Sequence, residues 1–201
     1  MPIRMQARQV LEYYQRQGRP AGQFAVCPFC GTRLHQEESG GRLRAACQAC
    51  GFVQHRNPAP AVAILVVDQG RVLLGRRGGE PGRGTEALPS GYVEWEDDFL
   101  STAIREAKEE TGLDVEVESI LTVVSSFVSP RFHFLSVYVV ARVVGGELAA
   151  SDDLEAVEWF PVKGPLPEMG FEEDLRVIEL YRDGFEGIPV DAKYARFDRR
   201  R

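Results

Sequence analysis

The hydrophobic positions at the start of the chain repeat with the period of a helix. They are Ile3, Ala7, Val10, Leu11 and Tyr14. This spacing places them on one face of a helix, which Gly18 and Pro20 would end. Because an apolar stripe on a surface helix needs something to pack against, we expect a docking helix. The pattern leaves open whether it packs on its own chain or on a second subunit.

Beyond residue 57, strand-like and helical segments follow one another. Residues 61–67 (AVAILVV) and 71–77 (RVLLGRR) are apolar runs separated by Asp68-Gln69-Gly70, which predicts two strands joined by a tight turn. Residues 98–111 have helical periodicity. Further strands are expected at 115–128, 132–144 and 156–160, and a last helix at 172–181. Because strands and helices intermingle, we predict an α/β or α+β domain with helices on the faces of a sheet.

Length and composition limit the number of cores that the chain can form. With 201 residues, 44% of them hydrophobic, it suits one ordinary domain and a small appendage. The expected segments are an N-terminal helix at 1–22, a Cys-rich domain at 23–56, the main domain at 57–185 and a C-terminal tail at 186–201. No apolar stretch approaches the roughly 20 residues of a membrane span, and the opening residues lack a signal-peptide pattern. We therefore expect a cytoplasmic protein without a membrane partner.

The net charge of −6 is unevenly distributed along the chain. Residues 1–57 hold 8 Arg against 3 Glu, and this excess of +5 leaves −11 for residues 58–201. Bound divalent metal is one reason for so acidic a domain. The arginines of the N-terminal part are most simply a solvated surface, so nucleic-acid binding is not expected.

All four cysteines occur in two Cys-x-x-Cys pairs, Cys27/Cys30 and Cys47/Cys50. A glycine follows each pair and lets the backbone turn sharply beside the sulfurs. In a chain without a secretion signal, this spacing predicts a zinc ribbon in preference to disulfides. Four thiolates complete a tetrahedral shell and leave no position for water, so Zn²⁺ is expected to be structural. Its binding would supply the folding free energy that the thin apolar core of this segment cannot.

The helix expected between Asp98 and Gly112 concentrates acid on one face. Asp98 suits the N-cap and Gly112 the left-handed C-cap. Glu106, Glu109 and Glu110 stand at i, i+3 and i+4, where like charges repel by roughly a few tenths of a kcal/mol per pair. A solvated acidic face usually holds one or two glutamates, so three grouped so closely indicate another role. Divalent cations remove the conflict, because carboxylate oxygens on a rigid helix are ligands that Mg²⁺ prefers.

The same stretch resembles a known sequence motif, the Nudix box, Gly-x5-Glu-x7-Arg-Glu-U-x-Glu-Glu-x-Gly-U, in which U is a bulky apolar residue. The matching positions are Gly91, Arg105, Glu106, Glu109, Glu110, Gly112 and Leu113. Together with the cysteine pairs, they make the chain similar to Nudix enzymes that carry an N-terminal zinc ribbon. This resemblance implies a Nudix-type α/β/α sandwich with a mixed sheet, preceded by a small ribbon domain.

The chain departs from the motif at some positions. Asp97 replaces the first glutamate of the box, and its side chain is one methylene shorter. Glu96 replaces a usual glycine, and Ala107 stands at a bulkier apolar position. The shorter acid changes the reach of this side chain toward a metal or toward the arginine of the motif.

The resemblance implies hydrolysis of a diphosphate linkage with Mg²⁺ or Mn²⁺. The implied metal ligands are Glu106, Glu109, Glu110 and the carbonyl of Gly91, and Arg105 and Asp97 complete the implied catalytic set. Glu106 is the first choice for the proton acceptor, with Asp153 and Glu155 in a late loop as weaker choices.

The substrate is expected to be a small nucleoside diphosphate-X, with ADP-ribose as first choice and FAD as second. Arg76 and Arg77 are candidates for contacting phosphate. The candidate rings for stacking on a base are Tyr92, Trp95, Phe127, Phe132 and Phe134. NADH pyrophosphatases carry Ser-Gln-Pro-Trp-Pro-Phe-Pro downstream of the box, where this chain has SSFVSPRF at 125–132. NADH and NAD-capped RNA are therefore alternatives to ADP-ribose.

A different class of function is also open. A Nudix domain could serve as a non-catalytic nucleotide sensor, although a binder needs no cluster of three metal ligands. Many Nudix enzymes are dimers, and the apolar stripe at residues 3–14 offers a surface, so a homodimer is expected.

Overall fold

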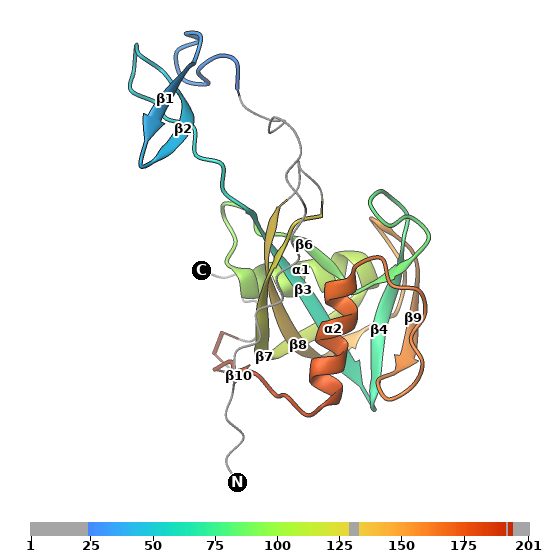
Figure 1. Cartoon of the computed structure of the whole chain (residues 1–201). Helices are drawn as coiled ribbons and strands as arrows, with labels where there is room; N and C mark the ends of the chain where they lie inside the picture. Colours follow the sequence, from blue (N-terminus) through green and yellow to red (C-terminus); the bar gives the residue numbers. More distant parts are fainter. Residues whose placement is uncertain (1–23, 129–132, 192, 195–201) are drawn as a thin grey trace. The chain divides into compact units, whose positions relative to one another are not determined.

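The computed structural model describes residues 24–128, 133–191 and 193–194. The described chain divides into two compact units, whose placement relative to each other is not determined (Figure 1). The larger comprises residues 60–126 with 134–191 and 193–194, and the smaller comprises residues 24–59 with 127–128 and 133. The helix predicted at residues 1–22 lies outside the described residues, as does Phe132.

The smaller unit is built around a β-hairpin. Strands β1 (His35–Ser39) and β2 (Arg42–Ala46) pair antiparallel across Gly40 and Gly41. Both glycines have positive φ, 60° and 73°, as a two-residue hairpin turn of the favoured twist requires. The buried residues of this unit are few and small: Cys27, Ala45, Ala46 and Cys47. Its apolar core is thus too small to explain its fold.

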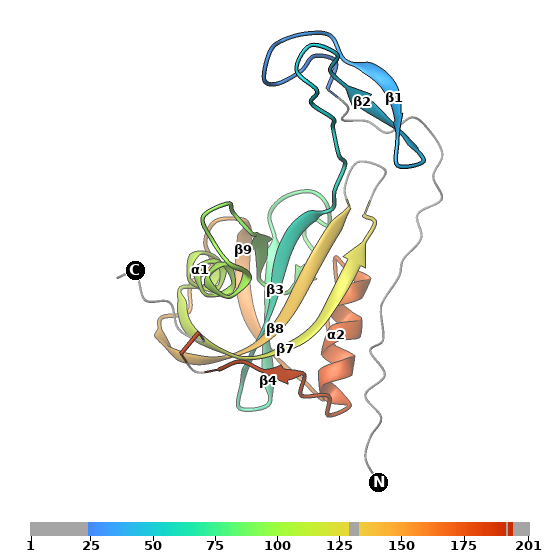
Figure 2. The same ribbon diagram turned by 90° about the vertical axis from the view of Figure 1, so that its left-hand side faces the viewer.

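The larger unit is a sheet with a helix on each face. The strands are β3 (Ala59–Asp68), β4 (Arg71–Arg77), β5 (Glu86–Ala87), β6 (Ser90–Tyr92), β7 (Leu113–Ser126), β8 (Phe134–Gly146), β9 (Leu154–Pro161) and β10 (Ile188–Pro189). Along the sheet the order is β10-β7-β8-β3-β4-β5, while β6 pairs with β3 and β9 with β4. The helices are α1 (Phe99–Thr111) and α2 (Glu172–Arg182). Figure 2 shows them on opposite sides of the sheet.

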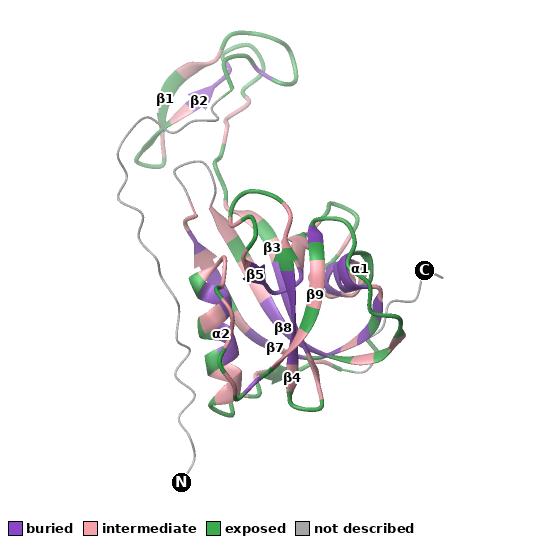
Figure 3. Ribbon diagram, turned by 90° about the vertical axis from the view of Figure 1, so that its right-hand side faces the viewer, coloured by how far each residue is buried: buried purple, intermediate pink, exposed green. Residues whose placement is uncertain are grey.

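Strand β3 supplies both cores because its side chains alternate between the two faces. Ala63 and Leu65 lie in the cluster that contains Val177 and Ile178 of α2. Their neighbours in the strand, including Ile64, lie in the cluster that contains residues of α1. Figure 3 shows the buried residues along the central strands and on the inner sides of both helices. This confirms the predicted α/β class and the helix-sheet-helix layering.

Local signals set the limits of α1. Asp98 is the N-cap, and its carboxylate accepts hydrogen bonds from the backbone N–H groups of Leu100 (2.8 Å) and Ser101 (3.0 Å). The Ser101 hydroxyl accepts in turn from the Asp98 N–H at 3.0 Å, which completes a capping box. Gly112 ends the helix in the left-handed region, with φ 72°. Both caps predicted from the sequence are therefore confirmed.

The sequence did not predict the short strands β5, β6 and β10. Ile188 and Pro189 pair with β7, so part of the expected C-terminal tail adds to the edge of the sheet. Two acidic residues of α2, Glu173 and Asp174, are buried. Among the described residues, no helix is long and apolar enough to cross a membrane.

Replacing the N-cap tests how much the local signal contributes to stability. We expect Asp98→Ala to lower the free energy of unfolding by about 1 kcal/mol, because two helix N–H groups lose their acceptor. Asp98→Asn keeps an acceptor and should lie close to the wild type. Urea unfolding followed by far-UV circular dichroism measures the difference, and equal stability of the Ala variant and the wild type would contradict the capping role.

Candidate active site

Arg105 gathers the acidic groups at the predicted site. Its guanidinium donates to Glu106 Oε1 at 2.8 Å and to Glu109 Oε2 at 2.9 Å through Nη1. Through Nε it donates to Asp97 Oδ2 at 3.0 Å, and through Nη2 to the carbonyl oxygen of Tyr92 at 3.3 Å. One side chain of α1 thus holds two glutamates of its own helix and the turn that precedes the helix. The shorter Asp97 still reaches the arginine.

Strand β6 closes against the two buried glutamates. Ser90 N–H donates to Glu110 Oε2 at 2.9 Å. At Gly91 the approach is closer still, because an added Cβ would lie 2.0 Å from both Cδ and Oε1 of Glu106. No other residue type leaves room for that carboxylate. The glycine that opens the motif is therefore explained by the packing of Glu106 against the backbone.

The three glutamates differ in exposure and in charge balance. Glu106 is 8% exposed and Glu110 4% exposed, whereas Glu109 is exposed to solvent. Burial raises the pKa of Glu110 to about 8, although the Ser90 N–H acts in the opposite direction. Burial also raises the pKa of Glu106 above its ordinary value, against the lowering effect of Arg105. Ionising both buried glutamates is therefore unfavourable beside a single guanidinium, and a divalent cation fits this set of oxygen donors.

A loop between β8 and β9 adds acid to the same region. The loop is tied to the end of α1, since Ala149 N–H donates to the Thr111 carbonyl at 2.9 Å and Ser151 N–H to the Glu110 carbonyl at 3.2 Å. Negative charge on Asp152 and Asp153 contributes to the raised pKa of Glu110. Asp153 was a sequence candidate, whereas Asp152 was missed, and only its place beside Asp153 could have indicated it. Glu155 is exposed and its side chain lies next to Gly78.

The two arginines proposed for phosphate already have partners in the protein. Arg76 Nε donates to Glu86 Oε1 at 3.0 Å. Arg77 Nε donates to the Pro81 carbonyl at 2.7 Å, and its guanidinium lies 4.9 Å from the ring centre of Phe171. Both arginines therefore hold neighbouring segments in this structure.

The candidate rings do not form one cluster. Trp95 is 95% exposed, at the tip of a turn in which Asp97 N–H donates to the Glu94 carbonyl at 3.2 Å. The rings of Tyr92 and Phe134 lie 5.7 Å apart. Phe127 belongs to the smaller unit, where its ring stacks on His133 at 3.8 Å.

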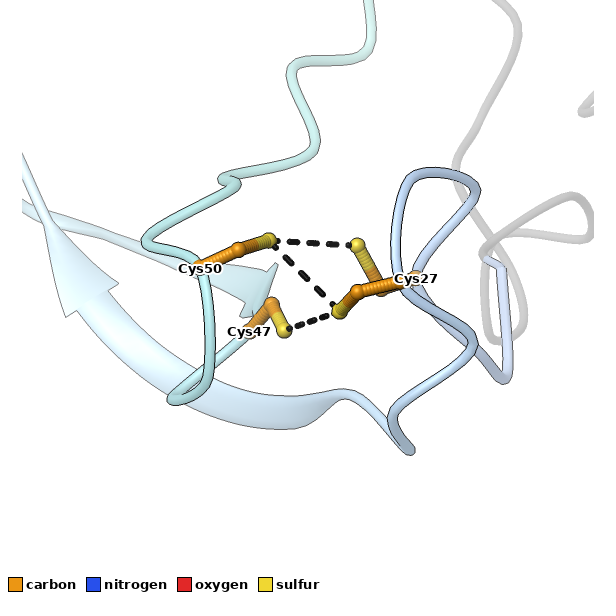
Figure 4. A group of neighbouring side chains, drawn as sticks. Cys27, Cys47 and Cys50 are labelled. Atoms are coloured by element: carbon orange, nitrogen blue, oxygen red, sulfur yellow. Dashed lines mark hydrogen bonds between the residues drawn. The ribbon is translucent and has the colours of Figure 1, made fainter.

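The four cysteines come together in the smaller unit, as predicted (Figure 4). Their sulfurs all lie within 4.8 Å of one another, with separations of 3.5 Å for Cys27–Cys50 and Cys30–Cys47 and 3.7 Å for Cys30–Cys50. A disulfide would bring two sulfurs to about 2.0 Å. Tetrahedral zinc with Zn–S bonds of about 2.3 Å places its sulfurs about 3.8 Å apart, so the cluster is compatible with zinc.

Both halves of the cluster have the same backbone geometry. Gly31 N–H donates to the Cys27 carbonyl and Gly51 N–H to the Cys47 carbonyl, each at 2.9 Å. Both glycines have positive φ, 71° and 74°. Hydrogen bonds from Thr32, chiefly from its hydroxyl, and from Cys47 lower the pKa of the Cys30 thiol to about 6. At Cys50 the backbone of Phe52 acts in the same direction, but the neighbouring cysteines raise the pKa to about 12. Without a cation, the four thiols therefore do not all ionise together, whereas metal binding requires the thiolate form.

The tight contact at Gly91 yields a direct test of the site. We expect Gly91→Ala to displace the Glu106 carboxylate and to weaken the binding of Mn²⁺ at least about tenfold, the size of effect seen when groups that orient metal ligands are lost. Gly79→Ala is the matched control, because nothing lies within 4 Å of a Cβ at that position. Titration calorimetry measures both, and unchanged Mn²⁺ binding by Gly91→Ala would contradict this reading of the glycine.

Comparisons with known proteins agree with this geometry. The NUDIX domain family matches residues 57–181. An ADP-ribose pyrophosphatase of Methanocaldococcus jannaschii is 38% identical over 126 residues, which cover 62% of this chain and 73% of the relative. A NAD-capped RNA hydrolase NudC of Stutzerimonas stutzeri is 27% identical over 175 residues, 86% of this chain but 61% of the relative.

A solved structure extends the likeness to three dimensions. The crystal structure of a NUDIX hydrolase from Nitrosomonas europaea superposes with a TM-score of 0.72 at 22% identity, covering 82% of this chain and 96% of that one. At this identity the likeness concerns the fold alone. The family match spans more than half of the chain and includes α1 with its glutamates, so the chain belongs to the Nudix family, as a Nudix pyrophosphohydrolase.

Proposed function

We propose that this Nudix pyrophosphohydrolase cleaves the diphosphate of a small nucleoside diphosphate-X, with ADP-ribose as first choice and FAD as second. The observation that carries the proposal is the cluster in which Arg105 holds Glu106, Glu109 and Asp97 beside the buried Glu110. Mg²⁺ or Mn²⁺ would be held by the three glutamates, with the Gly91 carbonyl as a further oxygen donor. Bound there, the metal would neutralise the diphosphate and lower the pKa of an attacking water.

The residues of the chain divide the remaining work. Arg105 orients the ligands rather than the substrate, because its N–H groups are directed at carboxylates and at the Tyr92 carbonyl. Glu106 is our first choice for accepting the proton of the water. Burial raises its pKa above the ordinary value, which makes it a stronger base than an exposed carboxylate. Asp153 is the alternative acceptor, from the loop that is tied to α1.

Several observations support ADP-ribose as our first choice. The relative with 38% identity is named an ADP-ribose pyrophosphatase, and its match covers most of its own length. The NudC relatives are less similar, and this chain lacks the downstream signature of NADH pyrophosphatases. The exposed Trp95 offers an indole face for an adenine ring, on a turn that Arg105 holds through Tyr92 and Asp97. Hydrolysis of NADH or of NAD-capped RNA is the alternative to these two substrates.

A substrate panel tests the proposal. We expect Mg²⁺-dependent turnover of ADP-ribose or FAD ahead of NADH, NAD-capped RNA, diadenosine polyphosphates and nucleoside triphosphates, measured as phosphate that a phosphatase releases from the products. Glu109→Gln should lower kcat about 100-fold or more, because it removes an anionic ligand from the metal site. Glu179→Gln, an exposed glutamine substitution on α2, is the control and should leave kcat unchanged.

The outcomes separate the rival functions. Faster turnover of NAD-capped RNA than of ADP-ribose would reverse the substrate order. Nucleotide binding without turnover under any divalent metal would instead indicate a sensor, with Glu96 and Asp97 as its departures from an active motif.

We also propose that the four cysteines hold one structural Zn²⁺. We expect one zinc per chain by elemental analysis, and the loss of this zinc in Cys47→Ser. Because the metal supplies the folding free energy of the smaller unit, the variant should lose the proteolytic resistance of residues 24–55. The Nudix unit has its own cores and should remain folded. A full complement of zinc in Cys47→Ser would argue against the assignment.

A further inference from the structure

A buried carboxylate lies on the side of the sheet opposite α1. Asp174, in the first turn of α2, is 4% exposed and has two hydrogen-bond donors. Its Oδ1 accepts from the hydroxyl of Tyr138 at 2.9 Å, and its Oδ2 accepts from the backbone N–H of Leu88 at 3.0 Å. Both donors belong to residues of the hydrophobic cluster that packs on α2. Burying an ionisable group costs free energy, and these two hydrogen bonds offset part of that cost.

Burial raises the pKa of Asp174 to about 7, and the charge of Glu173 adds to this effect. The Leu88 N–H, the Tyr138 hydroxyl and Arg77 act in the opposite direction. An apolar residue would fill the same space without this cost, but it could not accept a hydrogen bond from Leu88. Asp174 is therefore the acceptor that the buried Leu88 N–H requires.

Leu88 opens the link that leads to the candidate active site. β5 ends at Ala87, and the link runs through Leu88 and Pro89 into β6. The Pro89 carbonyl accepts from Ile64 N–H at 2.9 Å, and the next residue, Ser90, donates to Glu110. Gly91 follows, with its backbone against Glu106. Four consecutive residues thus run from Asp174 to two glutamates of α1.

The strand before this link has its own anchor. Glu86 N–H donates to the Glu168 carbonyl at 3.0 Å, and Gly170 N–H donates to the Glu86 carbonyl at 2.8 Å. These bonds fix β5 and stop short of the link. Beyond them, Asp174 is the group from α2 that holds the Leu88 peptide.

We propose that Asp174 is a positioning residue for the divalent-metal site: by binding Leu88 N–H it sets the link into β6, where Ser90 and Gly91 fix Glu110 and Glu106. The inference rests on the proposed function, because it takes these glutamates as metal ligands. In this proposal a residue of α2 orients two glutamates of α1 through the backbone of the sheet, without touching the substrate. Tyr138, the other partner of Asp174, provides the comparison, since its hydroxyl donates to Oδ1 of the carboxylate and Leu88 N–H donates to Oδ2.

Three variants separate positioning from general stability. Asp174→Ala removes the acceptor of Leu88, Asp174→Asn keeps it, and Tyr138→Phe removes the other bond to the same carboxylate. We expect Mn²⁺ binding, measured by calorimetry on the whole chain, to weaken about tenfold in the alanine variant, the usual size for a lost orienting group. The asparagine variant should stay within about threefold of the wild type, and Tyr138→Phe within about twofold. Weakening in Tyr138→Phe equal to that in Asp174→Ala would overturn the proposal.

A measurement on the wild type covers the case in which Asp174→Ala does not fold. Coupling between two sites is reciprocal, so a metal that binds the glutamates must in turn hold the link more firmly. We expect Mg²⁺ to slow hydrogen exchange of the Leu88 and Ser90 amides several-fold more than that of the Val177 amide within α2. Equal slowing at all three amides would overturn the proposal. If Asp174 controls metal binding while no substrate of the panel is cleaved, the proposed function fails and the positioning role stands.

Discussion

The architecture of the site depends on one guanidinium. Three glutamates within five residues of α1 would repel one another, and two of them are withdrawn from water. Arg105 offsets part of this repulsion by binding Glu106, Glu109 and Asp97 together, with distances of 2.8–3.0 Å. Three carboxylates in turn raise the pKa of Arg105, although its partial burial acts against them, so it stays charged. The charge that remains is the reason why the cluster suits a divalent cation.

The guanidinium could not hold this geometry without the backbone that faces it. Gly91 allows β6 to approach Glu106 closely, and Ser90 supplies an N–H to Glu110. These two residues follow the link that Asp174 binds from the other side of the sheet. The site is therefore assembled from both layers: α1 provides the acidic groups, and the strands between the helices provide the surface that orients them.

The smaller unit has little buried apolar surface to stabilise its fold. It buries only a few small side chains, and its two halves turn at Gly31 and Gly51 to bring the four sulfurs together. A hairpin with so little apolar surface is marginal by itself. Under the proposed zinc assignment, metal binding would therefore stabilise the fold of this unit, whereas the Nudix unit has two hydrophobic cores of its own.

The sequence by itself determined what depends on neighbours along the chain. The limits of α1 follow from Asp98 and Gly112, the turn after β3 from Gln69 and Gly70, and the grouping of the glutamates from helical spacing. The cysteine cluster was also predictable, because the turn of each Cys-x-x-Cys pair depends only on neighbouring residues.

Only the tertiary structure decided contacts between segments distant in sequence. β5, β6 and β10 are two or three residues long, so they carry no periodic signal, and their pairing with remote strands defines them. Nothing in the sequence of α2 distinguishes Asp174 from the exposed acid Glu172, yet Asp174 is buried, with Leu88 and Tyr138 as its donors. Arg76 and Arg77 stay candidates for phosphate, and the structure adds that each also binds a neighbouring segment, through Glu86 and the Pro81 carbonyl. A sequence shows which groups can form hydrogen bonds, whereas the partner of each group is set by the packing of the whole sheet.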